Sequence, residues 1–162
     1  MTETERKFLV KGDFRKEVYA SYDINQGYLC SDSIRTVRVR TKGPKGFITV
    51  KGRPMPGHLG RFEWEHEIPL EDAKQLLLLA NPGKIEKTRH LVRNTDGVHI
   101  WEIDEFHGAN EGLLLAEIEL KTENDSFDRP EWLGKEVSTD GRYYNSYLSR
   151  RPYREWTEDE KH

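Results

Sequence analysis

IRTVRVRTKGPKGFITVKG, residues 34–52, alternates apolar and polar side chains along two short segments. In Ile34 to Thr41 the valines alternate with arginines and threonines, and in Gly46 to Gly52 isoleucine and valine alternate with phenylalanine, threonine and lysine. Alternation with a period of two is typical of a β-strand that has one apolar face. Because Gly-Pro-Lys-Gly at 43–46 separates the two segments, the stretch predicts an antiparallel hairpin.

The same alternation recurs along most of the chain. The eight strand candidates are 2–10, 22–30, 34–41, 46–52, 61–68, 85–94, 98–106 and 113–121. Since short turns join most of them, we expect an all-β-dominated (α+β) fold in which an antiparallel sheet closes or nearly closes. The 162 residues suit one domain, and neither an internal repeat nor a linker divides them.

Helices are expected at only a few places. Residues 69–80, PLEDAKQLLLLA, predict an amphipathic helix that begins with proline, stops at Asn-Pro-Gly and covers part of the outside of the sheet. Shorter helices are predicted for 13–19, with Asp13 as N-cap, and for 132–136 and 142–150.

Composition excludes several classes of protein. A net charge of −3 gives no global attraction to nucleic acid or to an anionic membrane. The single cysteine, Cys30, excludes an internal disulfide and a cysteine-rich zinc site. No apolar run is long enough to cross a bilayer and no signal peptide opens the chain, so we expect a cytoplasmic protein.

Charged residues make up 34% of the chain, and they occupy particular strand faces. Residues two apart in a strand share a face. The resulting charged sets are Glu3, Glu5 and Lys7; Arg38 and Arg40; Lys51; Glu63 and Glu65; Lys87 and Arg89; Glu102 and Asp104; and Glu117 and Glu119. The simplest explanation is a sheet with one face in water. The alternative is a lumen with basic and acidic walls.

A lumen of this kind suits one class of ligand. Its arginines and lysines would neutralise a highly charged anion, and arginine grips phosphate oxygens with two donors. Its glutamates would repel the same anion unless Mg²⁺ or Mn²⁺ bridged carboxylate and phosphate oxygens. The charged faces therefore predict a site for a polyphosphate with divalent metal.

The ordered set of charged motifs resembles the CYTH, or triphosphate tunnel metalloenzyme, superfamily. ETERK at 3–7 fits its Glu-x-Glu-x-Lys motif. The resemblance continues through RVR at 38–40, VKG at 50–52, FEWE at 62–65, KTR at 87–89, WEIDEF at 101–106 and AEIELK at 116–121. The chain is most similar to the short, single-domain bacterial members that act as inorganic tripolyphosphatases.

This resemblance implies a closed eight-stranded antiparallel tunnel, with residues 140–155 as a C-terminal helical plug. The implied metal ligands, for Mg²⁺ or Mn²⁺ and two ions with substrate bound, are Glu3, Glu5, Glu117 and Glu119, with Asp104 as a further contributor. The implied phosphate-binding residues are Lys7, Arg38, Arg40, Lys51, Lys87 and Arg89. Glu63 and Glu65 match acidic tunnel positions whose role is less definite.

The leading functional hypothesis is metal-dependent hydrolysis of tripolyphosphate to pyrophosphate and phosphate. Glu3 or Glu117 would act as the base, and Lys7 and Lys87 would stabilise charge on the phosphates. The alternatives are a class IV-type adenylyl cyclase, a thiamine or nucleoside triphosphatase, and a non-catalytic polyphosphate- or nucleotide-binding module. A small polyphosphate or nucleotide is the expected partner, without nucleic acid or membrane, for a monomer or a homodimer.

Overall fold

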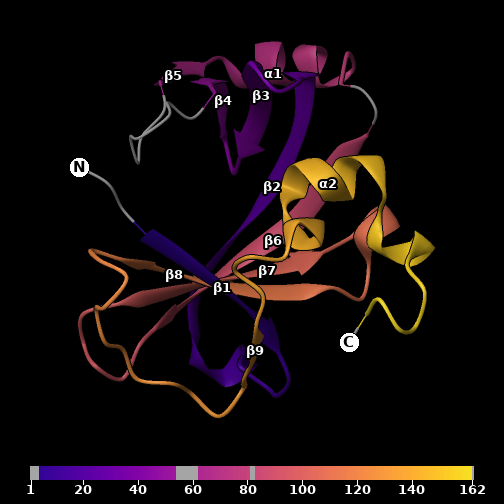
Figure 1. The fold of residues 1–162 in the computed structure, drawn as a ribbon. Coiled ribbons are helices and arrows are strands. Elements are labelled where there is room, and N and C mark those ends of the chain that lie inside the picture. The colour runs from indigo at the N-terminus through magenta and orange to yellow at the C-terminus, as the bar shows by residue number, and fades with distance from the viewer. Residues whose placement is uncertain (1–3, 54–61, 81–82, 162) are drawn as a thin grey trace.

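The computed structural model describes residues 4–53, 62–80 and 83–161, and its strands form one antiparallel sheet (Figure 1). The strand order is β5-β4-β3-β2-β6-β7-β8-β1-β9. The strands are β1 (Thr4–Val10), β2 (Val18–Ser31), β3 (Arg35–Lys42), β4 (Lys45–Gly52), β5 (Glu63–Ile68), β6 (Lys84–Arg93), β7 (Ile100–Phe106), β8 (Leu114–Leu120) and β9 (Leu133–Glu136).

Helices are short and few in the described ranges. They are α1 (Leu70–Leu77), α2 (Asn145–Arg150) and the 3-10 turns η1 (Arg15–Glu17), η2 (Gly108–Asn110), η3 (Gly141–Tyr143) and η4 (Tyr153–Glu155). None of the helices in these ranges is long and apolar enough to cross a membrane. The predicted helix at 69–80 is present as α1, which begins after its N-cap Pro69 but ends at Leu77, three residues before the predicted end; residues 81 and 82 of the predicted stop lie outside the described residues.

Two of the predicted short helices are wrong in type or extent. Residues 132–136 were expected to be helical, but Leu133–Glu136 form β9, which pairs with β1 at Phe8↔Glu136. A Cβ on Gly134 would lie 2.8 Å from the Leu9 carbonyl oxygen, so glycine allows the close approach of the two backbones. In residues 13–19 only the η1 turn is helical.

The sheet is mostly β and antiparallel, as predicted, but the strand order does not close it. Strand β5 pairs with β4 and strand β9 with β1, and no pairing within the described residues joins β5 to β9. The long strands β2 and β6 link the β3–β5 part to the part made by β1 and β7–β9 (Figure 1). Closure into an eight-stranded tunnel therefore stays a prediction.

The main core lies on the side of the sheet opposite the charged faces. Phe8, Trp101, Ile103 and Ile118 are completely or almost completely buried there. Each alternates along its strand with a charged residue, so burying one set of side chains directs the other set to the opposite face. The charged residues are thus brought onto one side by the packing of their apolar neighbours.

Helix α1 packs on the outside of the β2–β4 part of the sheet. Ala73 and Leu77 of the helix form a cluster with Val39 of β3. A Cβ on Gly46 would lie 2.7 Å from the Cβ of Ala73, so the glycine lets the helix approach β4 closely. This contact confirms the expectation that the helix covers part of the outer face.

A second apolar cluster joins the C-terminal segment to one end of the charged side. Ile85, Phe106 and Leu115 continue the strand faces that carry charged residues elsewhere. Leu148 of α2 and Trp156 pack against this cluster. Since the cluster anchors them to the sheet, the residues that precede α2 lie next to the charged side chains.

Candidate active site

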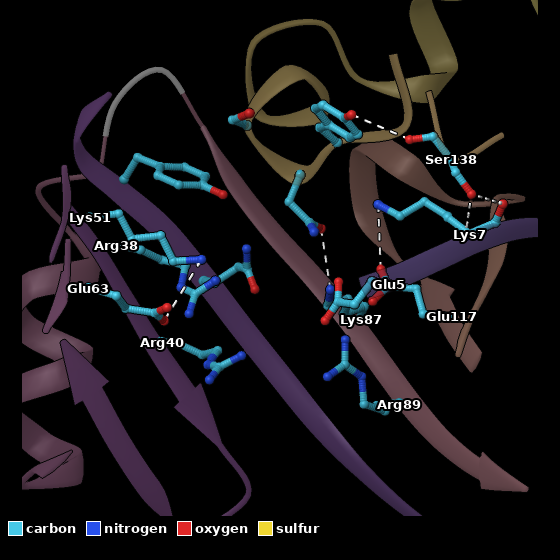
Figure 2. A pocket seen from close by; sticks show the side chains of 15 residues that line it. Glu5, Lys7, Arg38, Arg40, Lys51, Glu63, Lys87, Arg89, Glu117 and Ser138 are labelled. Carbon is cyan, nitrogen blue, oxygen red and sulfur yellow. Dashed lines mark hydrogen bonds and ion pairs between the residues drawn. The ribbon is translucent and has the colours of Figure 1, made fainter. Parts of the chain in front are cut away.

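A cavity of about 540 Å³ brings together side chains from both parts of the sheet and from the C-terminal segment (Figure 2). The residues that line it are Glu5, Lys7, Gln26, Tyr28, Arg38, Arg40, Lys51, Glu63, Lys87, Arg89, Glu117, Ser138, Tyr144, Asn145 and Ser146. Nine of these were predicted from the sequence as site residues. Glu3, also predicted, lies outside the described residues.

One wall of the cavity is basic and comes from β3 and β4. Arg38 and Arg40 are neighbours on one face of β3, and Lys51 projects from β4 beside them (Figure 2). Burial, followed by the charge of Arg38, lowers the pKa of Arg40 below its ordinary value. Positive charges held this close together in a partly buried place favour binding of an anion.

Acidic residues of the edge strand β5 contact this basic wall. Glu63 lies 3.9 Å from Lys51 Nζ, and Glu65 Oε1 lies 3.5 Å from Arg40 Nη2. Glu65 Oε1 also accepts a hydrogen bond of 2.7 Å from Thr49 Oγ1. An anion that bound to the arginines would therefore compete with Glu65.

The opposite wall presents two lysines. Lys7 Nζ lies 3.4 Å from Glu117 Oε1 and donates to the carbonyl oxygen of Tyr143 at 3.1 Å. Lys87 Nζ donates to Asn145 Oδ1 at 3.3 Å. Figure 2 shows both lysines beside Glu117, across the cavity from the arginines of β3.

Asp104 lies buried beneath this wall and does not line the cavity. Its carboxylate lies 2.8 Å from Lys87 Nζ and accepts hydrogen bonds of 2.8 and 3.0 Å from Nε and Nη2 of Arg89. Burial alone would raise the pKa of Asp104, but the charges of Lys87 and then Arg89 lower it to about 2. Asp104 is therefore an anion that holds two cations in place.

The remaining carboxylates stand close to one another. Burial first, and then the charges of Glu117 and Glu102, raise the pKa of Glu5. Glu119 faces Glu5 in the β1–β8 pairing, and it lines a neighbouring cavity together with Glu102. Mutual repulsion of this kind is relieved when a cation binds between the carboxylates.

No three His, Cys, Asp or Glu side chains within 4–53, 62–80 and 83–161 lie close enough together to form a metal site by themselves. The chemistry of the carboxylates nevertheless fits Mg²⁺ or Mn²⁺. These ions commonly take one or two carboxylates and complete their coordination with water and phosphate oxygens. Glu5 and Glu117 could supply those carboxylate oxygens.

Three buried donors of the cavity residues have no hydrogen-bond acceptor in the described part of the chain. They are Gln26 Nε2, Arg38 Nε and Arg40 Nε. Gln26 is 2% exposed and faces Arg40 in the β2–β3 pairing. A buried donor without an acceptor is costly, and an anion rich in oxygen atoms would satisfy all three.

Sequence reasoning missed six of the residues that line the cavity. Gln26 and Tyr28 share a face of β2 and pair with Arg40 and Arg38, so the period of two could have indicated them once the β2–β3 register was known. Ser138, Tyr144, Asn145 and Ser146 lie in a segment without strand periodicity. The family resemblance placed Tyr144, Asn145 and Ser146 within the expected C-terminal plug at 140–155, but no pattern in the sequence indicated these four residues individually.

Comparison with known proteins agrees with this geometry. Residues 1–150 match the CYTH domain family. An inorganic triphosphatase of Acetivibrio thermocellus is 43% identical over 157 residues, which cover 96% of this chain and 98% of that protein. An inorganic triphosphatase of Nitrosomonas europaea is 37% identical over 153 residues, which cover 92% of this chain and 97% of that protein.

The fold of a solved structure is also similar. A crystal structure described as that of an inorganic triphosphatase is 33% identical, with a TM-score of 0.72, over 92% of this chain and 95% of that chain. The match extends along nearly the whole length of both proteins. This chain belongs to the CYTH domain family.

Proposed function

We propose that this chain hydrolyses triphosphates, with inorganic tripolyphosphate as the preferred substrate and pyrophosphate and phosphate as products. The observation that carries the proposal is the set of unsatisfied donors on Gln26, Arg38 and Arg40, which line a cavity that also contains lysines. Kinship with two inorganic triphosphatases at 43% and 37% identity supports the choice of substrate.

The phosphate chain would lie between the two basic walls. We assign its binding to Lys7, Arg38, Arg40, Lys51, Lys87 and Arg89, and add the amide of Gln26. Arginine on one wall and lysine on the other would neutralise the charge of adjacent phosphates. On binding, the substrate would replace Glu63 as the partner of Lys51 and Glu65 as the partner of Arg40.

The proposed metal ligands are Glu3, Glu5, Glu117 and Glu119, for two Mg²⁺ or Mn²⁺ ions when substrate is present. Asp104 was expected to contribute to this set, but its oxygens already accept from Lys87 and Arg89. We therefore assign Asp104 to holding those two side chains. Bound metal would offset phosphate charge and favour deprotonation of a water molecule.

The protein itself would contribute a base and a source of protons. Glu117 or Glu3 would accept the proton of the attacking water. Lys7 and Lys87 would stabilise negative charge on the leaving phosphate. Burial lowers the pKa of Lys87. An ammonium group of this kind gives up a proton more readily than ordinary lysine, which suits Lys87 to protonating the leaving oxygen.

Closure of the sheet is part of the proposal. Arg38 and Arg40 stand on the β3–β5 part, whereas Lys7 and Lys87 stand on the other part. A triphosphate bound by both sets would draw the two parts together. The eight-stranded tunnel implied by the family resemblance would then enclose the substrate, and exclusion of water would strengthen each charged contact.

The test is phosphate release from tripolyphosphate, ATP and thiamine triphosphate, each with Mg²⁺, with Mn²⁺ and with a chelator. We expect tripolyphosphate to be hydrolysed fastest and the chelator to abolish release. Comparable rates on all three substrates would remove the claim of preference. Formation of cyclic AMP and pyrophosphate from ATP would favour the cyclase alternative, and binding without turnover under either metal would favour a binding module.

A further inference from the structure

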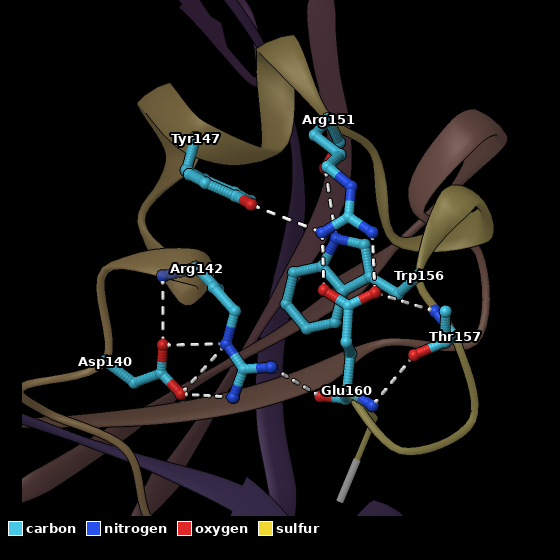
Figure 3. A network of polar contacts seen from close by, with 7 residues as sticks. All are labelled: Asp140, Arg142, Tyr147, Arg151, Trp156, Thr157 and Glu160. Atoms are coloured by element: carbon cyan, nitrogen blue, oxygen red, sulfur yellow. Dashed lines mark hydrogen bonds and ion pairs between the residues drawn. The ribbon is translucent and has the colours of Figure 1, made fainter.

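Residues 151–161 follow the region that matches the CYTH domain family, and they fold back on it (Figure 3). Arg151 and Glu160 form a two-point ion pair in which both N···O distances are 2.5 Å. The same carboxylate accepts from the Thr157 backbone N–H at 3.0 Å. We call Arg151, Trp156, Thr157 and Glu160 the C-terminal clasp.

The clasp residues contact the chain segment that precedes α2. The carbonyl oxygen of Glu160 accepts a hydrogen bond of 3.0 Å from Arg142 Nη1, and Arg142 in turn binds the Asp140 carboxylate at 2.6 Å. Trp156 is 4% exposed, and its ring meets the Tyr143 ring edge-on with centroids 5.2 Å apart. The clasp thus fixes residues 140–143 through polar contacts, which Figure 3 shows, and through the aromatic contact between Trp156 and Tyr143.

The segment held in this way touches both lysines of the active-site cavity. The Tyr143 carbonyl oxygen accepts from Lys7 Nζ at 3.1 Å, and Asn145 Oδ1 accepts from Lys87 Nζ at 3.3 Å. Arg151, Glu160 and Trp156 themselves do not line the cavity. Any effect of these three residues on substrate binding would therefore be transmitted through the backbone of Tyr143 and the side chain of Asn145.

Each lysine ammonium has three N–H donors. Lys7 directs two of them at Tyr143 and Glu117, and Lys87 directs two at Asp104 and Asn145. Both lysines line the cavity, so the third N–H of each is the donor that a ligand bound there would use. Since the other two directions are fixed, the third is fixed as well, and this is the pre-organisation that favours binding of a particular anion geometry.

We propose that the C-terminal clasp positions Tyr143 and Asn145 so that Lys7 and Lys87 each present one N–H to the phosphate chain. The proposal rests on the proposed function for the identity of the ligand. Asn145, Arg151 and Glu160 are then positioning residues. A clasp that served only to stabilise the fold would leave affinity for a triphosphate unchanged in any variant that stays folded.

The test is a double-mutant cycle in the full-length chain, with Glu160→Gln, Asn145→Ala and the double variant. Affinity is measured by calorimetry with Mg²⁺ and a methylene-bridged tripolyphosphate analogue, which the enzyme cannot cleave. The melting temperature of each variant is recorded, and titrations are made well below the lowest one. Arg151→Gln serves as a second way to open the clasp should Glu160→Gln fold poorly.

The matched control is Glu105→Gln. Glu105 forms another two-point pair with an arginine, at 3.0 and 3.4 Å from Arg15, but it does not line the cavity. We expect this variant to bind the analogue as the wild type does. A loss of affinity in the control equal to that of Glu160→Gln would overturn the proposal, because any lost ion pair would then have the same effect.

We expect Glu160→Gln and Asn145→Ala each to weaken binding by at least about fivefold. The double variant should bind no more weakly than Glu160→Gln alone, because opening the clasp already loosens the Asn145 contact that the second change removes. Unchanged affinity in folded Glu160→Gln, or losses that multiply in the double variant, would overturn the proposal. Wild-type turnover of tripolyphosphate is measured separately, so its absence would refute the proposed function while the cycle still tests the clasp.

Discussion

Lys87 Nζ lies 2.8 Å from Asp104 Oδ2, and the two side chains are only 2% and 3% exposed. Arg89 binds the same carboxylate from its other side, at 2.8 Å. A buried carboxylate between two cations fixes both of them, and Arg89 Nη1 is held further by Glu102 Oε2 at 2.7 Å. The pair explains how a lysine can be held at the wall of a cavity with little conformational freedom.

Replacing Asp104 by Asn should be strongly destabilising. The change preserves size but leaves Lys87 without its buried counter-ion and Arg89 with only the partly exposed Glu102. Loss of one partner from such a group costs about 3–5 kcal/mol, so we expect the free energy of unfolding in urea to fall by about 3 kcal/mol or more. The control Glu71→Gln, at the exposed Lys74–Glu71 pair, should cost less than about 1 kcal/mol. Equal losses in the two variants would contradict this account.

Replacing Glu119 by Ala should remove metal-dependent activity without unfolding the protein. Glu119 is exposed at the end of β8 and faces Glu5 across the strand pair, so truncation opens no cavity in the core. We expect phosphate release to fall by roughly 100-fold or more, with an unchanged circular dichroism spectrum. Glu123→Ala, another exposed glutamate, is the control. Full activity of Glu119→Ala would refute its assignment as a metal ligand.

Replacing Glu65 by Gln should tighten substrate binding. Glu65 lies 3.5 Å from Arg40 and 3.8 Å from Arg38, where it would compete with an incoming phosphate. Glutamine keeps the hydrogen-bonding shape but removes the repulsion, so KM for tripolyphosphate should fall by about threefold to tenfold. Glu71→Gln, at an exposed pair on α1, should leave KM unchanged. A higher KM for Glu65→Gln would show that the carboxylate assists binding.

His99 should titrate above its ordinary pKa of 6.5. Its hydrogen bond to Asp96, at 2.6 Å, raises the pKa, and Asp125 at 3.3 Å acts in the same direction. Because the folded-state pKa is the higher one, the stabilisation is complete below pH 6.5 and is lost as pH rises through the folded value. NMR titration of the His99 ring should show this shift, and Asp125→Asn should reduce it. A pKa at or below 6.5 would contradict the contacts.

The strands and the cations could be predicted because both depend on local alternation. In β3, for example, Val39 is buried and Arg38 and Arg40 project to the other face, as a period of two requires. The helix predicted at 69–80 has a local signal as well, since its proline marks the observed start, whereas α1 ends at Leu77, before the predicted stop. Where a segment contains its own periodic pattern and boundary residues, its secondary structure can be predicted from the sequence alone.

The remaining features depend on which segments meet. Leu133–Glu136 is too short to show a period, and only pairing with β1 makes it a strand. Likewise, the sequence placed Lys87 and Asp104 on charged faces, but their contact requires the β6–β7 register. Asn145 reaches the cavity because apolar packing of Leu148 and Trp156 carries its segment there. Sequence patterns indicate which face of a strand a side chain occupies, whereas these contacts between segments depend on tertiary structure.

The most direct test of the central claim is product analysis of tripolyphosphate incubated with the purified protein and Mg²⁺ or Mn²⁺. The account predicts one phosphate and one pyrophosphate for each tripolyphosphate consumed, and no release when a chelator replaces the metal. Release at the same rate with chelator, or intact tripolyphosphate with both metals, would contradict it.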